Sequence, residues 1–172
     1  MSLRHFGVLG CLLFSGLTGW AGVAGSMNIS APAFALGQPI PAKCADKEQN
    51  ISPELRIADV PANARSLVLI MDDPDAPAGL WTHWLVWNLP PDTASIPEGS
   101  LPPGALQGKN SFGHVRYDGP APPSGTHRYF FHLYALDEML TLPAGAGRAA
   151  LLGAIKGHQV GTSETFGVYS AH

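Results

Sequence analysis

The chain has 172 residues, enough for one domain with one hydrophobic core. Its formal net charge of −3 and its 13% of charged residues argue against nucleic acid as a partner, because nucleic-acid-binding proteins carry dense basic surfaces. Glycine and proline contribute 20 and 16 residues, a share below that of disordered chains but enough for many turns between short strands.

Residues 1–25 have the pattern of an export signal. Arg4 and His5 precede an apolar stretch at residues 6–17, and small residues follow at 24–26. The apolar stretch is too short to span a bilayer, so we expect cleavage after residue 24 or 25. The sequence therefore predicts a periplasmic or secreted protein with a single domain over residues 26–172.

Loss of the signal would leave Cys44 as the one cysteine, because Cys11 lies within the removed segment. An internal disulfide is then excluded, and packing must stabilise the fold. A lone thiol is most often buried, and a disulfide to another chain is the alternative.

The first half of the mature chain predicts short strands that end in turns. Prolines interrupt residues 26–50, which suits edge strands and loops, and residues 52–57 suit a strand after a turn. A stronger signal is the apolar run at residues 67–71, which predicts a buried strand.

The stretch at residues 70–89 reads I-M-D-D-P-D-A-P-A-G-L-W-T-H-W-L-V-W-N-L and predicts two strands joined by a rigid loop. Asp73 and Asp75 lie where the first strand meets the loop, and the prolines exclude a continuous ladder. The period of two places His83 on the same face as Leu85 and Trp87. Carboxylates and a histidine at strand ends are a candidate site; the alternative is a plain turn beside a strand histidine.

Two long segments rich in glycine and proline follow. Five prolines within residues 90–103 argue against a regular ladder there and predict a surface loop. The segment at residues 108–125 is too long for an ordinary connection, so we expect it to be functional or tightly packed.

Residues 126–137 read T-H-R-Y-F-F-H-L-Y-A-L-D and predict a long strand. Alternation places His127 and Tyr129 on one face and Arg128 and His132 on the other. Both faces are largely apolar, which is typical of a central strand in a two-layer sandwich.

The C-terminal part predicts one helix and one strand. Apolar residues recur at three-residue spacing within 144–158, and Pro143 suits the start of the helix. A last strand is expected over residues 161–170.

Motifs in a fixed order now identify a resemblance. They are N-I-S-P at 50–53, D-P-D-A-P at 73–77, W-T-H-W at 81–84, G-K-N-S-F-G at 108–113, and Y-D-G-P-A-P-P at 117–123 with G-T-H-R-Y at 125–129. From residue 50 to residue 137 the chain resembles the phosphatidylethanolamine-binding protein family, in the bacterial branch often described as Raf kinase inhibitor-like.

The resemblance implies a mainly β fold, an antiparallel Greek-key β-sandwich with a few short helices. It implies a small pocket for phosphate-type anions or phospholipid head groups, with no cofactor and no metal. The pocket residues carried over by position are Asp73, Asp75, Trp81, His83, Gly119, Ala121, Pro122, His127 and Tyr129. Tyr169 is a weaker match to a C-terminal tyrosine near the pocket.

Two departures from the family pattern bear on the pocket rim. Arg116 stands where a glycine usually precedes the tyrosine of the Tyr-x-Gly-Pro loop, and residues 157–169 are atypical. The arginine either adds a fork-shaped phosphate donor or points to solvent.

Carboxylates beside an anion have two physical explanations. An aspartate can hold a neighbouring histidine oriented or protonated, or it can meet the ammonium of a zwitterionic head group. We expect the module to bind such ligands weakly, and a protein partner acting through the same surface stays open. Family members in bacteria often form homodimers, which the sequence leaves undecided.

Two enzymatic alternatives remain. His83, His127 and an aspartate could form a metal-binding facial triad, although no compact pair spacing supports it. Ser111 or Ser124 could act with His127 and an aspartate as a serine hydrolase, although the G-x-S-x-G elbow is missing.

The other aromatic and histidine residues carry weaker signals. Trp81 lies in the loop and is a pocket candidate, whereas Trp84 and Trp87 are expected in the core. His132 is expected in the core or at an interface, and His114, His158 and His172 have no assigned role.

Overall fold

The computed structural model describes residues 26–171, and the predicted export signal lies outside this range. The described elements are, in chain order, β1 (Asn28–Ser30), the 3-10 turn η1 (Ala42–Cys44), β2 (Leu55–Ala58), β3 (Ser66–Asp73), β4 (Trp81–Leu89), β5 (Ser95–Ile96), β6 (Leu106–Gln107), β7 (Thr126–Leu136), α1 (Arg148–Ile155) and β8 (Gln159–Ser170).

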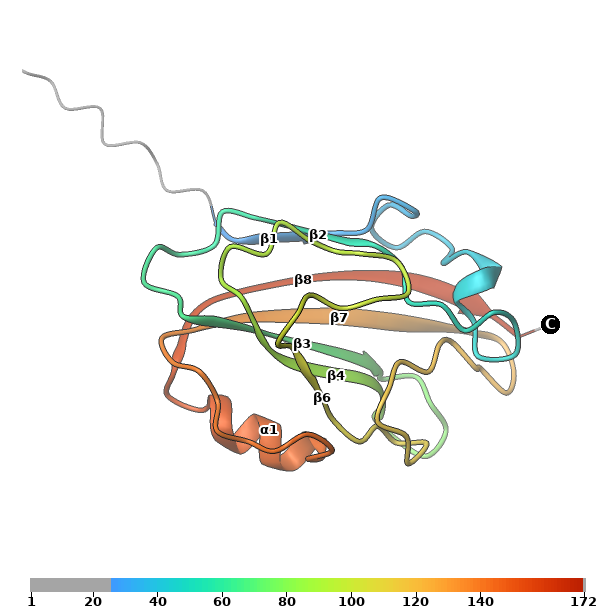
Figure 1. Ribbon diagram of the computed structural model, residues 1–172. Coiled ribbons are helices and arrows are strands. Elements are labelled where there is room, and N and C mark those ends of the chain that lie inside the picture. Colours follow the sequence, from blue (N-terminus) through green and yellow to red (C-terminus); the bar gives the residue numbers. More distant parts are fainter. Residues whose placement is uncertain (1–25, 172) are drawn as a thin grey trace, which may run out of the picture.

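The strands form two antiparallel sheets. The smaller has the order β1-β2-β5 and the larger the order β6-β4-β3-β7-β8. Figure 1 shows the small sheet on one side of the large sheet and α1 on the other. The predicted mainly β fold of antiparallel sheets is confirmed. Within residues 26–171, no helix has the length and apolarity needed to cross a membrane.

Strand β3 is buried along its whole length because both faces of the large sheet are covered. Leu67, Leu69 and Met71 pack into the core between the two sheets. Val68 and Ile70 pack on the opposite face, against the side of α1. The continuous apolar run at residues 67–71 therefore reflects burial on two faces rather than one.

The structure corrects two predicted boundaries. The proline-rich segment expected to be free of ladder contains β5, in which Ile96 is fully buried and pairs with Leu55. Residues 92–96 lie between the prolines and retain their N–H groups, so a short pairing is possible. The helix is shorter than expected: it begins after Gly147, not at Pro143, and ends at Ile155, ahead of Gly157 with a positive φ of 86°.

Cys44 ends the turn η1, and its thiol is completely buried. Burial raises the pKa of this thiol to about 11, so the thiolate is disfavoured at neutral pH. The backbone carbonyl of Cys44 accepts a 2.9 Å hydrogen bond from the Tyr117 hydroxyl. The residue therefore packs as a small apolar group, the more common of the two predicted alternatives.

Candidate functional site

A cavity of about 230 Å³ opens where the end of β3 meets the starts of β4 and β7. Antiparallel pairing of β3 with both neighbours brings these three strand ends together, although they are far apart in sequence. Two loops close the cavity, residues 74–80 and residues 108–125. The lining residues are Asp73, Ala76, Pro77, Ala78, Trp81, His83, Phe112, Ala121, Pro123 and His127.

Asp73 and His127 form a buried pair in this cavity. The Asp73 Oδ2 atom lies 2.7 Å from His127 Nδ1, and the two side chains are 4% and 9% exposed. An ionised carboxylate only accepts hydrogen bonds, so with Asp73 ionised the Nδ1 atom carries the hydrogen. The aspartate thereby fixes the ring of His127 and leaves its Nε2 atom for a ligand.

His83 does not lie on the face predicted for it. The pairing of β3 with β4 shifts between Met71 and Asp72, which are opposite Trp84 and Thr82, so His83 is the extra residue of a β-bulge. Its ring packs edge-on against Tyr129, 5.2 Å between centroids, on the face between the two sheets. Bulges turn side chains in this way next to binding sites, and the period of two fails there.

The protonation of His83 follows from its contacts. His83 Nδ1 lies 2.8 Å from the backbone carbonyl of Asp118, which can only accept, so Nδ1 carries a hydrogen. Burial lowers the pKa of His83, and the ring is neutral at neutral pH. The Nε2 atom of the unliganded protein is therefore an acceptor rather than a donor.

Tyr129 is fully buried beside the cavity, next to His83. Its hydroxyl makes no hydrogen bond to any residue in the described range, although the Asp73 carboxylate and the Ala121 backbone are nearby. Burial raises the pKa of Tyr129, and the Asp73 charge raises it further, so the phenol stays protonated. A buried hydroxyl without a partner costs stability unless a water or ligand atom satisfies it.

An aromatic wall completes the cavity. Trp81 and Phe112 meet edge to face with centroids 5.5 Å apart, and Phe112 also contacts the ring of His83 at 5.3 Å. Trp81 was a predicted pocket residue, and Trp84 and Trp87 are buried in the core as expected. Phe112 was not singled out from the sequence; its position in the long loop at residues 108–125 was the available signal.

Asp75 does not line the cavity. Its carboxylate binds the Arg128 side chain through two hydrogen bonds of 2.8 and 2.6 Å, and it also accepts from the Arg128 backbone N–H. The hydrogen bond from the guanidinium lowers the pKa of Asp75 to about 2. This pair connects the 74–80 loop to β7 at the edge of the cavity.

The remaining predicted residues lie in the 119–125 loop. Ala121 lines the cavity, whereas Pro122 lines a neighbouring cavity that Tyr169 also borders. Gly119 lines neither cavity. Its N–H donates to Asn50 Oδ1 at 2.8 Å, and a Cβ atom at this position would lie 1.8 Å from the carbonyl oxygen of Cys44. The glycine permits this close approach of two backbones.

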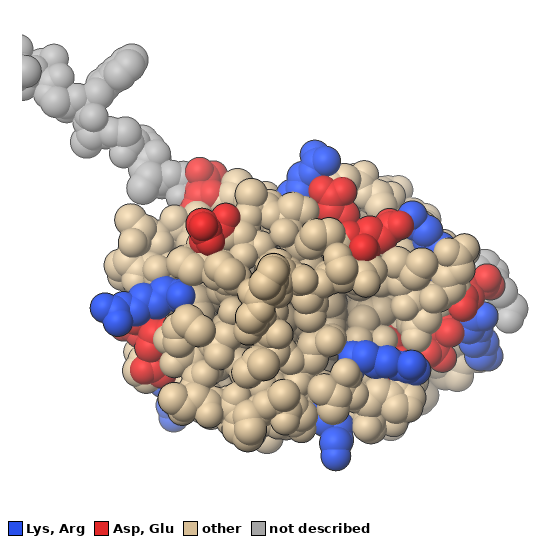
Figure 2. Space-filling view, viewed as in Figure 1, with Lys and Arg blue, Asp and Glu red and all other residues tan. Residues whose placement is uncertain are grey.

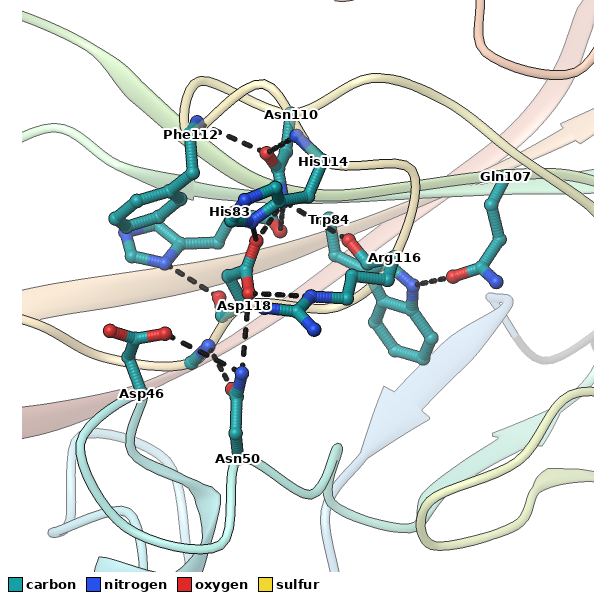
Figure 3. Close-up of polar contacts among 11 residues, drawn as sticks. Asp46, Asn50, His83, Trp84, Gln107, Asn110, Phe112, His114, Arg116 and Asp118 are labelled. Carbon is teal, nitrogen blue, oxygen red and sulfur yellow. Dashed lines mark hydrogen bonds and ion pairs between the residues drawn. The ribbon is translucent and has the colours of Figure 1, made fainter.

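A polar network around Asp118, the residue whose backbone carbonyl contacts His83, was not predicted from the sequence (Figure 3). Its centre is the fully buried carboxylate of Asp118, which binds Asn50, Asn110, His114 and Arg116 at distances of 2.7–3.2 Å. Burial alone would raise the pKa of Asp118, but these partners outweigh it and lower the pKa. His114, which had no predicted role, is thus one of the residues that fix this loop.

The described residues do not form the groupings that the metal-dependent enzyme and the serine hydrolase would need. Within residues 26–171, no three His, Cys, Asp or Glu side chains are grouped as metal ligands. Ser111 Oγ accepts a hydrogen bond from the Thr82 backbone N–H at 2.9 Å, and the exposed Ser124 makes no hydrogen bond to His127 in the described chain. Among the residues that the structure describes, neither serine is hydrogen-bonded to a histidine.

Comparisons with known proteins agree with this architecture. The family model for phosphatidylethanolamine-binding protein matches residues 30–170. The chain belongs to the phosphatidylethanolamine-binding protein family. A family relative from Methanothermobacter thermautotrophicus, called a UPF0098 protein, is 47% identical over 148 residues, which cover 83% of this chain and 98% of the relative.

Two solved structures of the family resemble the chain as a whole. The putative phosphatidylethanolamine-binding protein homologue CT736 of Chlamydia trachomatis has a TM-score of 0.82 and 42% identity, and the match covers 86% of this chain and 99% of that one. YbcL of Escherichia coli, described as a member of the mammalian family, has a TM-score of 0.79 and 27% identity, with coverage of 86% and 100%.

Proposed function

We propose that this protein of the phosphatidylethanolamine-binding protein family is a binding module whose cavity takes phosphate-type anions, free or as part of a phospholipid head group. The supporting observation is that Asp73, His83 and His127 line one small, largely apolar cavity, with the unpartnered Tyr129 hydroxyl buried beside His83. Few convergent polar groups in an apolar recess are typical of ligand sites.

The contacts of the two carboxylates support a site for the phosphate rather than the ammonium of a head group. Asp73 is already bound to His127, and Asp75 is already bound to Arg128. Neither has to meet a ligand ammonium, so the first explanation for carboxylates near an anion is favoured over the second. We expect inorganic phosphate and phosphoethanolamine to bind with affinities within about threefold of each other, since the ammonium gains little.

Binding should be linked to proton uptake. The Nε2 atom of neutral His83 cannot donate to a phosphate oxygen, so either this ring or the phosphate must carry an additional proton in the complex. An anion stabilises the protonated ring and raises its pKa on binding. Affinity should therefore increase as pH falls from about 8 to 6, near the usual histidine pKa.

Calorimetric titration of the protein with inorganic phosphate and with phosphoethanolamine tests the proposal. His83→Ala and His127→Ala should each abolish the binding heat while leaving the fold intact. His132→Ala is the matched control, because His132 lies on the opposite face of β7 and pairs with Glu164. Retained binding in both pocket variants would overturn the assignment.

Two further titration conditions separate the alternatives. Titrations in two buffers with different heats of ionisation measure the protons taken up. Repeating them after chelation and after adding zinc distinguishes a metal-dependent activity, which would show binding or turnover only with the metal.

Export and protein contacts are further parts of the proposal. N-terminal sequencing of the protein recovered from the periplasm or medium would test cleavage after residue 24 or 25. A protein partner would bind at the same rim, so excess phosphate should compete with it.

A further inference from the structure

A second cavity, of about 300 Å³, lies on the other side of the Asp118 network from the His83 cavity. Figure 3 shows His83 and Phe112 on one side of Asp118, and Arg116, Trp84 and Gln107 on the other. The two cavities share no lining residue. The size is sufficient for a small organic molecule, at the lower end of ordinary ligand pockets.

Arg116 supplies a positive charge that is held in place and still available. Its Nε atom donates to the fully buried carboxylate of Asp118 at 3.0 Å, which fixes one edge of the guanidinium. The two terminal nitrogens make no hydrogen bond to any residue in the range 26–171, and the side chain is 59% exposed. These nitrogens form the fork that binds carboxylate or phosphate oxygens in pairs.

Other donors line the same cavity. Gln107 accepts from the Trp84 indole N–H through Oε1 at 2.8 Å, which leaves its amide NH₂ group for a ligand. The Ser52 hydroxyl, in a residue that is 4% exposed, has no hydrogen bond within the described chain. Ile51 and Leu101 add half-buried apolar surface. The cavity therefore offers one charged fork, neutral donors and an apolar wall.

The ion pair with Asp118 offsets part of the Arg116 charge but leaves the two terminal nitrogens without a partner in the described range. Asp118 also binds Asn50, Asn110 and His114, and the nearby Glu98 is paired with Lys43 at 2.7 Å. On the face shown in Figure 2, lysine and arginine side chains are separated by large uncharged areas rather than gathered in a basic patch. An anion here would be recognised by a single arginine in a shaped recess, not by a diffuse field.

We propose that this cavity, the Arg116 cavity, is a second ligand site that binds a small organic anion: one carboxylate or phosphate on an apolar body about the size of one ring. The anionic group pairs with the terminal nitrogens of Arg116, and the body packs against Ile51 and Leu101. The proposal is independent of phosphate binding at His83, and either can fail without the other.

Nuclear magnetic resonance separates the two cavities because each contains its own tryptophan. Trp84 lines the Arg116 cavity and donates its indole N–H to Gln107, whereas Trp81 lines the His83 cavity. Titration with benzoate or phenyl phosphate should shift the indole resonance of Trp84 and the side-chain amide of Gln107, with dissociation constants of about 1 mM or tighter. Comparison of the two ligands distinguishes carboxylate from phosphate recognition.

Three variants test the assignment. Arg116→Gln should weaken binding at least about tenfold, and Arg116→Lys, which keeps the charge but loses the fork, should weaken it about threefold or more. Ser100→Trp, at an exposed wall position, should fill the cavity and abolish the shifts. Arg65→Gln removes an exposed charge beside the start of β3 and should leave the affinity within about twofold.

The outcomes are decisive in both directions. The proposal is supported if the ligand-induced shifts of Trp84 disappear in Arg116→Gln and in Ser100→Trp, while the spectra of both variants otherwise match that of the wild type. Shifts confined to Trp81, equal affinities of the wild type and Arg116→Gln, or no shift with either ligand at about ten times the expected constant would overturn it.

Discussion

Asp72 and Asp73 are adjacent in β3, and both are almost fully buried, yet they belong to different parts of the molecule. Asp72 lies on the helix face, where its carboxylate binds the Arg148 side chain at 2.8–3.3 Å and accepts from the Thr82 hydroxyl at 2.7 Å. Asp73 lies on the face between the sheets, where it binds His127 beside the cavity.

The partner, more than the burial, decides what each carboxylate does. Arg148 is always charged and joins α1 to the sheet, so the Asp72 pair stabilises the packing of the helix. His127 can gain or lose a proton and has a second ring nitrogen, so the Asp73 pair can respond to a ligand. Substitution of either aspartate tests this difference between the two pairs.

The largest effect should come from Asp72→Asn. The substitution leaves the partly buried Arg148 guanidinium without its charged partner and should lower the free energy of unfolding by about 3 kcal/mol. Urea denaturation measures this loss. Phosphate affinity should stay within about twofold, because Asp72 faces away from the cavity. A large loss of affinity in a folded Asp72→Asn protein would contradict the separation of the two faces.

Asp73→Asn should reverse this pattern. The amide oxygen can still accept from His127, so the free energy of unfolding should fall by about 1.5–2 kcal/mol, less than for Asp72→Asn. Phosphate affinity should fall about tenfold or more, because the ring of His127 loses its charged support. Calorimetry and urea denaturation of the same preparation check both quantities. A large loss of stability with nearly unchanged phosphate affinity would mean that Asp73, like Asp72, acts mainly in packing.

The next effect is the pH dependence of the free energy of unfolding that His83 causes on the cavity side of β3. The pKa of His83 is lower in the folded state than its usual value near 6.5, so its contribution to stability is present above that pH and decreases as pH falls. Each pH unit below about 6.5 should cost up to about 1.4 kcal/mol until the lowered folded pKa is reached. Urea denaturation from about pH 8 to 5 should show a smaller loss for His83→Gln.

The smallest effects are expected for the Asp75–Arg128 pair, which is more exposed than the pairs of Asp72 and Asp73. The two side chains are 28% and 52% exposed, and exposed pairs contribute little. Arg128→Gln should change the free energy of unfolding by less than about 1 kcal/mol and phosphate affinity by less than about twofold, in the same two assays. A tenfold loss of affinity would show that the 74–80 loop needs this contact to shape the cavity.

The sequence predicts the strands well where burial on both faces leaves a long apolar run, as in β3 and β7. The prediction of which face His83 lies on is wrong, because a β-bulge depends on how two strands pair. The apolar–polar alternation within a single strand does not reveal it. The sequence also misses the partners of Asp118: Asn50 lies 68 positions away, and only the folded loops bring the two together. His114 and Arg116 are close in sequence, but their common partner is known only from the structure.

Gly119 was predicted as a pocket residue from its place in a motif, yet its surroundings are the backbone of residues 44 and 45 and the Asn50 amide. Any side chain here would separate the 119–125 loop from the N-terminal segment. The 119–125 loop therefore takes up its place only where it meets a part of the chain about 75 residues away in sequence. Gly119 thus marks the point where two backbone segments cross, and its presence says nothing about the ligand.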